Sequence, residues 1–389
     1  MRYFLVGPKK DAAAPSQGYG LLVVMPGGDG SAEFQAFVKR IFQHALPDGY
    51  IVAEPVAVKW TPDQQIVWPT RSDAEKGQKF STEEFVEAVI KDVQAKQPLD
   101  KGRIFTLTWS SSGPAGYAIA MQPNTAVTGS FIAMSIFRPE QYPTLAKAKG
   151  RAFYIYHSPD DQLISLGQAE EARDALARAG AKVQLVTYQG GHGWSSGTPF
   201  EDIRKGVRWL EHPTATATAP ALAAGANMKP PFTDRLETGT GAPMGWIRGA
   251  AVEGVTYLWD KNTAQDGKAS LSIKKTSQRY FPIAEWSHAF PYDGTSPILN
   301  VSAMVKADKV SKAILDVQLL SGPGKDGWQH QWAAYIGAKE QGDPPATHDW
   351  KEYSGTVEIP KGTKRIIIGL QMYGPGQVWF DDVKVEYAK

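Results

Sequence analysis

The sequence predicts two domains of different fold class: an α/β domain with a mostly parallel sheet over residues 1–212 and an all-β sandwich or jelly roll over residues 231–389. Strand-like and helix-like segments alternate between residues 20 and 210, which is typical of a mostly parallel sheet covered by helices on both faces. Short alternating apolar and polar runs dominate the second half. Residues 213–230 are rich in Ala, Thr and Pro without an amphipathic pattern, and such a composition indicates a linker between domains.

The composition narrows the possible functions and partners. A formal net charge of +2 argues against a nucleic-acid-binding surface, and no apolar run is long enough to span a membrane. The chain has 0 cysteines, which excludes disulfides, thiolate metal sites and a cysteine nucleophile. Residues 1–8 read as a first strand and not as a signal peptide. We expect a secreted or periplasmic protein whose signal peptide is absent from this sequence, and a cytoplasmic location stays open.

The elements of the first domain are predicted from hydrophobic periodicity. Continuous apolar runs are typical of strands buried on both faces, and apolar residues at a spacing of three and four indicate the buried stripe of a helix. The expected strands are 20–25, 50–57, 104–109, 127–134, 152–156 and 183–188, and the expected helices are 34–45, 82–97, 117–121, 166–179 and 200–210.

A serine-rich turn follows the strand 104–109. The sequence Trp109-Ser-Ser-Ser-Gly113 fits the pattern G-x-S-x-G of a nucleophile elbow, except that tryptophan replaces the first glycine. In this register Ser111 is the nucleophile. A shift by one residue would make it Ser110, and the sequence leaves that alternative open.

An aspartate and a histidine follow two later strands. Asp161 lies in the loop after strand 152–156, where Asp160 is an alternative, and His192 lies between glycines after strand 183–188. The chain order Ser, Asp, His is that of α/β hydrolases. A serine hydroxyl needs a histidine to accept its proton, and a carboxylate to orient that histidine, so these three residue types predict nucleophilic catalysis.

Residues 20–212 resemble the phospholipase/carboxylesterase and dienelactone-hydrolase-like branch of the α/β hydrolases. The resemblance depends on four segments: residues 22–30, 107–114, 157–161 and 188–194. It implies that Ser111, Asp161 and His192 form the catalytic triad. It also implies that the N–H groups of Gly28 and Ser112 form the oxyanion hole. Ser158 stands where a glycine is usual.

The second domain is predicted to be an antiparallel sandwich of roughly eight strands. Its last segment, 376–385, contains Trp-Phe-Asp-Asp-Val and resembles the final strand of carbohydrate-binding-module-like jelly rolls. The resemblance implies that exposed tryptophans stack on sugar rings, with Trp328, Trp332 and Trp350 as candidates. It also implies a structural calcium, to which Asp381 and Asp382 could contribute.

These features together predict a serine carboxylic-ester hydrolase that needs no cofactor or metal for catalysis. Trp60, Trp68 and Trp194 are expected to line the substrate site. The expected substrate is an acyl or feruloyl ester of a polysaccharide or a small ester, and the second domain is expected to bind the polysaccharide or a polymer surface. Two alternatives are a polyesterase with a polymer-adsorbing sandwich and a catalytically inactive glycan-binding protein.

Overall fold

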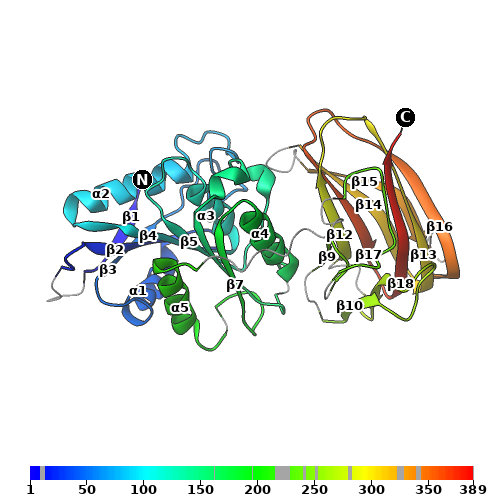
Figure 1. The fold of residues 1–389 in the computed structure, drawn as a ribbon, viewed down its shortest axis with the longest axis horizontal. Helices are drawn as coiled ribbons and strands as arrows, with labels where there is room; N and C mark the ends of the chain where they lie inside the picture. Colours follow the sequence, from blue (N-terminus) through cyan, green and yellow to red (C-terminus); the bar gives the residue numbers. More distant parts are fainter. Residues whose placement is uncertain are drawn as a thin grey trace. The chain divides into compact units, whose positions relative to one another are not determined.

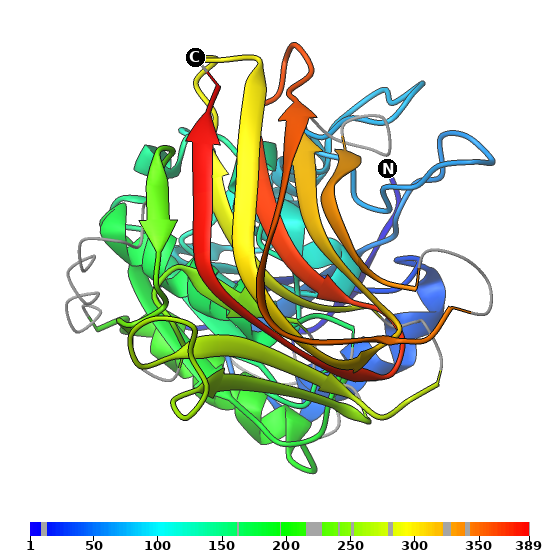
Figure 2. The ribbon, with the colours of Figure 1, turned by 90° about the vertical axis from the view of Figure 1, so that its right-hand side faces the viewer.

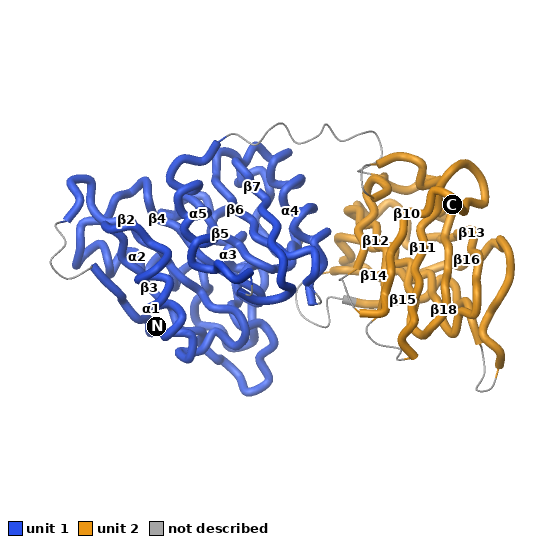
Figure 3. Tube along the Cα trace, turned by 90° about the horizontal axis from the view of Figure 1, so that it is seen from below, with its two compact units in different colours: residues 1–220 blue, residues 221–389 orange. Residues whose placement is uncertain are grey.

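The computed structural model describes residues 1–8, 14–161, 163–194, 196–214, 228–239, 242–249, 253–278, 283–321, 328–338 and 343–388. The chain divides into two compact units, Met1–Pro220 and Ala221–Lys389 (Figure 3). The division agrees with the predicted change of fold class. Most of the predicted linker 213–230 lies outside the described residues.

Unit 1 contains a seven-stranded sheet in the order β1-β3-β2-β4-β5-β6-β7 (Figure 1). Only the edge strand β1 runs antiparallel to its neighbour, and the remaining strands are parallel. This sheet confirms the predicted α/β class. The strands are β1 (Tyr3–Val6), β2 (Tyr19–Met25), β3 (Tyr50–Pro55), β4 (Leu99–Trp109), β5 (Gly129–Ala133), β6 (Ala152–His157) and β7 (Lys182–Thr187).

Helices cover both faces of this sheet. The helices are α1 (Gln35–His44), α2 (Thr82–Lys96), α3 (Gly113–Ala120), α4 (Leu166–Arg178) and α5 (Pro199–Glu211). One hydrophobic cluster joins the sheet to α1 and α5, and two others join it to α2, α3 and α4. The first turn of α2 shows how local sequence fixes a boundary: Ser81 Oγ accepts the N–H of Glu84, whose carboxylate accepts the N–H of Ser81.

The topology gathers three loops at one edge of the sheet. Strands β4, β6 and β7 are parallel members of the same sheet, and their carboxyl ends are followed by the serine turn, the aspartate loop and the histidine loop. Because parallel strands end at the same edge, side chains far apart in sequence meet there.

Unit 2 is a sandwich of two antiparallel sheets, which confirms the predicted all-β class (Figure 2). A six-stranded sheet has the order β10-β11-β18-β13-β16, with β8 paired to β18, and a five-stranded sheet has the order β15-β14-β17-β12-β9. The strands are β8 (Phe232–Asp234), β9 (Trp246–Arg248), β10 (Val255–Asp260), β11 (Ser270–Lys275), β12 (Ala284–Pro291), β13 (Ile298–Val310), β14 (Lys312–Leu320), β15 (Trp328–Gly337), β16 (Ala346–Glu358), β17 (Arg365–Met372) and β18 (Gly376–Tyr387).

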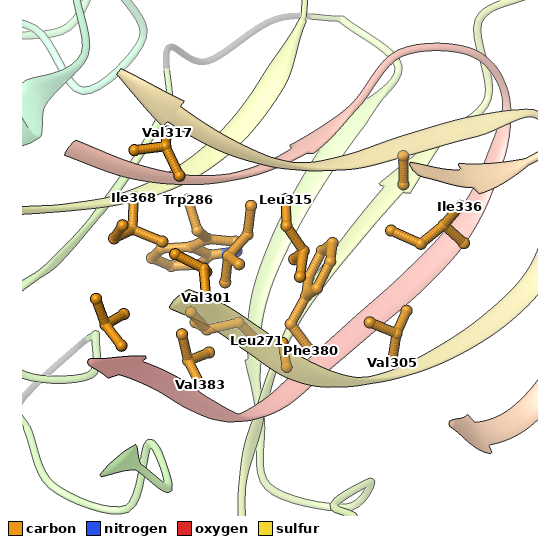
Figure 4. Close-up of a cluster of buried hydrophobic side chains, with 14 of the residues drawn as sticks. Leu271, Trp286, Val301, Val305, Leu315, Val317, Ile336, Ile368, Phe380 and Val383 are labelled. Carbon is orange, nitrogen blue, oxygen red and sulfur yellow. The ribbon is translucent and has the colours of Figure 1, made fainter. Parts of the chain in front are cut away.

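Alternate residues of these strands fill the space between the two sheets (Figure 4). Trp286 of β12 and Phe380 of β18 are the large aromatic members of the labelled cluster, and both are almost completely buried. Trp246 is also buried in this core. These tryptophans are therefore part of the core of the sandwich. Among the described residues of the whole chain, no helix has the length and apolar character needed to cross a membrane.

Candidate active site

Ser110 occupies a sharp turn between β4 and α3. Its backbone has φ 54°, in the left-handed region that residues other than glycine rarely adopt. Such a strained strand-to-helix turn raises a serine hydroxyl above the edge of the sheet. The carbonyl oxygen of Ser110 is held by Ser135 Oγ, which donates to it at 2.8 Å.

Ser110, His192 and Asp161 form a continuous hydrogen-bonded chain. Ser110 Oγ lies 3.1 Å from His192 Nε2, and His192 Nδ1 lies 2.8 Å from Asp161 Oδ2. The Asp161 side chain is fully buried, whereas that of His192 is 19% exposed. The three residues come from the ends of β4, β6 and β7, so the fold brings together a serine, a base and an acid as the sequence predicts.

The position of the serine differs from the expectation by one residue. Ser111, predicted to face the histidine, instead donates its hydroxyl to the carbonyl oxygen of Gly28 at 2.8 Å. Ser112, predicted to supply an oxyanion N–H, is completely buried, and its hydroxyl bonds to Met25 and Trp109. The structure therefore corrects the register: Ser110 faces His192, and Ser111 is the residue that follows it.

The glycine pattern explains why the register is hard to recognise. In the corrected register the places of the two motif glycines belong to Thr108 and Ser112. Space for close packing comes from other glycines: a Cβ on Gly116 would lie 2.5 Å from Thr108 Oγ1, and one on Gly27 would lie 2.6 Å from Trp109. Gly116 and Gly27 thus provide the space for close packing against β4 that the motif glycines provide in the usual elbow.

Asp161, and not Asp160, is the aspartate whose carboxylate contacts His192. Asp161 Oδ1 accepts the N–H groups of Leu163 and Ile164 at 2.8 and 2.9 Å. Burial alone would raise the pKa of this carboxyl, but the bonds from His192 and from the two N–H groups outweigh burial and hold the pKa below its usual value. Asp161 is therefore ionised at neutral pH, as a carboxylate that stabilises an imidazolium must be.

A pocket of about 290 Å³ opens beside Ser110 and Ser111. Its walls come from residues 65–73, from the loop after β5 and from Ile164 of the aspartate loop. Apolar and polar side chains both line it, and Asp73, Arg138 and Gln141 are among the polar ones. The loop after β5 carries no catalytic motif, so its contribution was not predicted; the signal available was its position after a central strand.

Of the three tryptophans expected to line a substrate site, one lines the pocket beside Ser110. Trp68 lines the pocket, and its indole N–H donates to the carbonyl oxygen of Pro26 at 2.9 Å. Trp60 instead packs edge-on against Phe80, and Trp194 packs against Trp109 at 5.7 Å. Trp194 follows the histidine loop inward to the core, so proximity in sequence to His192 was a misleading signal.

The outer face of the five-stranded sheet of unit 2 carries a polar network with an aromatic neighbour. Gln371 Nε2 donates to Glu285 Oε2 at 2.5 Å and to Asp316 Oδ2 at 2.9 Å, and His330 Nδ1 lies 3.0 Å from Asp316 Oδ2. Burial raises the pKa of Glu285 to about 7. Trp332, which is 52% exposed, lies opposite Asp316 across the β14–β15 pair. The side chain of Trp328 lies outside what the structure describes.

The two aspartates of β18 to which a calcium role was assigned have hydrogen-bond or charged partners in the protein. Asp381 is buried, its Oδ2 accepts the N–H groups of Gln265 and Asp266, and its Oδ1 accepts that of Asp382. Asp382 Oδ1 lies 3.7 Å from the guanidinium of Arg235. Among the described residues, no group of three or more His, Asp or Glu side chains is arranged to hold a metal.

No model of a protein family matches this chain, and neither does any curated protein. Similar solved structures include the Bacillus cereus carboxylesterase, with 15% identity, a TM-score of 0.39, and coverage of 54% of this chain and 93% of that chain. Another is the fluorophosphonate-binding serine hydrolase F of Staphylococcus aureus, with 14% identity, a TM-score of 0.40, and coverage of 52% and 87%.

The CBM22-1 xylan-binding domain from Paenibacillus barcinonensis is similar with 15% identity, a TM-score of 0.30, and coverage of 41% of this chain and 95% of that chain. At these values of identity and TM-score, the activity of this chain has to be inferred from its own geometry. That geometry defines an α/β-hydrolase fold with a serine, a histidine and an aspartate in hydrogen-bond contact, followed by a β-sandwich.

Proposed function

We propose that unit 1 is a serine hydrolase of carboxylic esters, with Ser110 as nucleophile, His192 as base and Asp161 as the acid that orients it. The observation that carries this proposal is the contact of Ser110 Oγ with His192 Nε2 at 3.1 Å, on a histidine whose other nitrogen contacts a buried carboxylate. An exposed serine alone would not support the proposal, because a serine without a base is a poor nucleophile.

The geometry supports a two-step reaction. His192 Nε2 accepts the Ser110 proton while Ser110 Oγ attacks the ester carbonyl carbon, and the resulting imidazolium then protonates the leaving alcohol as the C–O bond breaks. A water molecule, deprotonated by the same nitrogen, attacks the acyl-enzyme. The acid leaves, and the proton returns to Ser110. Asp161 stabilises the imidazolium at each step without taking its proton.

The oxyanion is assigned to the backbone N–H groups of Ser111 and Gly28. Ser111 lies in the first turn of the helical segment that starts at Ser110, where N–H groups have no partner within the helix. The hydrogen bond from Ser111 Oγ to Gly28 O holds the two backbones beside each other. This assignment keeps the predicted Gly28 and replaces Ser112 by Ser111.

The pocket favours a compact acyl or alcohol group. A pocket of about 290 Å³ with polar groups among apolar walls accommodates a short acyl chain or one aromatic ring better than a long fatty chain. Small esters and short acyl or feruloyl esters of polysaccharides belong to this size class.

The test uses p-nitrophenyl acetate and butyrate with wild type and Ser110→Ala. The variant is expected to lose activity by about a thousandfold or more, because it removes the nucleophile. A fluorophosphonate probe is expected to add one adduct to wild type, on the peptide containing Ser110, and none to Ser110→Ala. Full turnover by Ser110→Ala would refute the assignment, and a wild type inert to both esters and to the probe would refute the esterase.

A second candidate function, glycan binding by unit 2, is favoured by Trp332. A half-exposed indole beside a network of carboxylates and amides is a surface on which a sugar ring can stack and form hydrogen bonds. Affinity electrophoresis in soluble xylan and other polysaccharides tests this function. Trp332→Ala should lose any retention, whereas Trp350→Ala, on β16 of the other sheet, should keep it. A wild type that no glycan retards would remove this function.

A further inference from the structure

His157, the last residue of β6, is a buried histidine next to the acid that the reaction above does not use. Its Nε2 lies 3.0 Å from the carbonyl oxygen of Ile164 and 3.5 Å from Asp161 Oδ2. Because a carbonyl oxygen can only accept, Nε2 must carry a proton. Burial lowers the pKa of this imidazole, so the ring is neutral at neutral pH with that single proton directed at Ile164.

Ile164 connects this ring to the acid. The Ile164 carbonyl accepts from His157, while the Ile164 N–H donates to Asp161 Oδ1 at 2.9 Å. The N–H of Leu163 donates to the same oxygen at 2.8 Å. Two fixed donors on Oδ1 leave Oδ2 directed at His192 Nδ1. The orientation of Asp161 therefore depends on the position of Ile164, which the hydrogen bond from His157 Nε2 to the Ile164 carbonyl holds in place.

A second group ties the same loop to the histidine loop. Ser158 Oγ accepts the N–H of Asp160 at 3.0 Å and the N–H of Gly191 at 3.1 Å. Gly191 directly precedes His192. The aspartate loop is thus joined to the histidine loop through Ser158 and to the ring of His157 through the Ile164 carbonyl.

The cost of this ring indicates a role beyond packing. His157 Nδ1 is buried, and among the residues that the structure describes it has no hydrogen-bond partner. A buried acceptor without a partner destabilises a fold, because no hydrogen bond compensates for its loss of water. An apolar side chain would fill the site without this penalty, but it would not donate to Ile164.

We propose that His157 is a positioning residue of the ester-hydrolysing site, which acts through Ile164 to hold Asp161 Oδ2 against His192. This inference rests on the proposed function. It assigns to the ring a mechanical role: the Nε2–H group fixes the loop that carries the acid, and no proton passes through it during turnover.

The test compares two substitutions of His157 whose side-chain amides mimic one or the other nitrogen of its ring. His157→Gln can place an N–H near the position of Nε2, whereas His157→Asn places it near that of Nδ1. We expect His157→Asn to lower kcat by about tenfold on p-nitrophenyl acetate and butyrate alike, with KM changed by less than about twofold. His157→Gln should recover most of the loss. Thermal unfolding of both variants is measured, and assays are made well below the unfolding temperature.

Three results would overturn the inference: equal kcat for His157→Asn and wild type, equal losses for the Asn and Gln variants, or a loss confined to one acyl group. The last would show that His157 acts through the pocket wall formed by Ile164. If His157→Asn fails to fold, His157→Leu replaces it, with the same expectation. A wild type that is inert, or a Ser110→Ala variant that is active, would instead refute the esterase itself, so the two failures are distinguishable.

Discussion

The hydroxyl of Ser111 donates to the carbonyl oxygen of Gly28 at 2.8 Å, so the two adjacent serines Ser110 and Ser111 have different partners. Ser110 Oγ faces His192, whereas Ser111 Oγ is used to join the elbow to the glycine turn after β2. The serine expected to attack the substrate is therefore a structural link between the two backbone segments assigned to the oxyanion hole.

Ser111→Ala should lower kcat/KM by no more than about tenfold, because it removes one neutral hydrogen bond and leaves both N–H groups in place. Steady-state assays with p-nitrophenyl acetate check the value, and Ser110→Ala measured beside it gives the scale. A loss as large as that of Ser110→Ala would return the nucleophile to Ser111.

Asp161→Asn should lower kcat by about 10⁴-fold, the size of the effect in serine protease triads, because an amide favours the wrong histidine tautomer. Asp160→Asn is the matched control. Its carboxylate is exposed, and its backbone N–H, which the substitution leaves in place, donates to Ser158 Oγ, so kcat should stay near that of wild type. If the two variants exchanged their effects, the acid would be Asp160.

Gly113→Ala should destabilise unit 1 by about 1–3 kcal/mol, as overpacking does, and lower kcat at the same time. A Cβ on Gly113 would lie 1.9 Å from Ser135 Oγ, the group that holds the Ser110 carbonyl. Urea unfolding and ester assays measure the two effects. Gly102→Ala, where the nearest atom is 3.3 Å away, is the control, and equal behaviour of both variants would contradict the packing argument.

Glu54→Gln should stabilise the protein at alkaline pH. Glu54 is fully buried in β3 and, among the described residues, neither carboxylate oxygen has a hydrogen-bond partner. Burial raises the pKa of Glu54 from 4.5 to about 7, although Lys39 opposes the shift. The folded chain thus holds this proton more tightly than the unfolded chain. The resulting stability is full below pH 4.5 and is lost as the pH rises through about 7.

The measurement is the free energy of unfolding of wild type and Glu54→Gln at pH 4.5 and pH 8, where other titrating groups cancel in the difference. The advantage of the variant should be greater at pH 8 than at pH 4.5 by about 3 kcal/mol, the energy of a shift of this size. An advantage independent of pH would show that Glu54 is not protonated in the fold.

The fold class was predictable because it depends on periodicity. Strands such as β2 and β6 are continuous apolar runs buried along their whole length, and α2 carries both its buried stripe and its capping residues in sequence. The start of α3 was harder to predict from the sequence. The helix begins at Gly113, not at residue 117, because a glycine and Pro114 in its first turn obscure the pattern.

The site was predictable in kind but not in register. Asp161 and His192 follow strands and sit in turn-forming sequence, so their position was visible. The choice between Ser110 and Ser111 depended on which residue has φ 54°, and that choice depends on Gly113, Gly116 and Gly27 packing against other segments. Contacts of that type are tertiary and leave no local pattern. The same holds for Trp194, whose position depends on its packing against Trp109.

The left-handed backbone of Ser110 has a consequence for how such a chain can change over time. This conformation costs most residues, serine among them, about 1–2 kcal/mol, and it costs glycine or asparagine less. Selection for folding alone would therefore erode the serine, and only a benefit from its hydroxyl would retain it. In a set of relatives, drift at position 110 would mark the lineages in which ester chemistry has been lost and the fold kept for other uses.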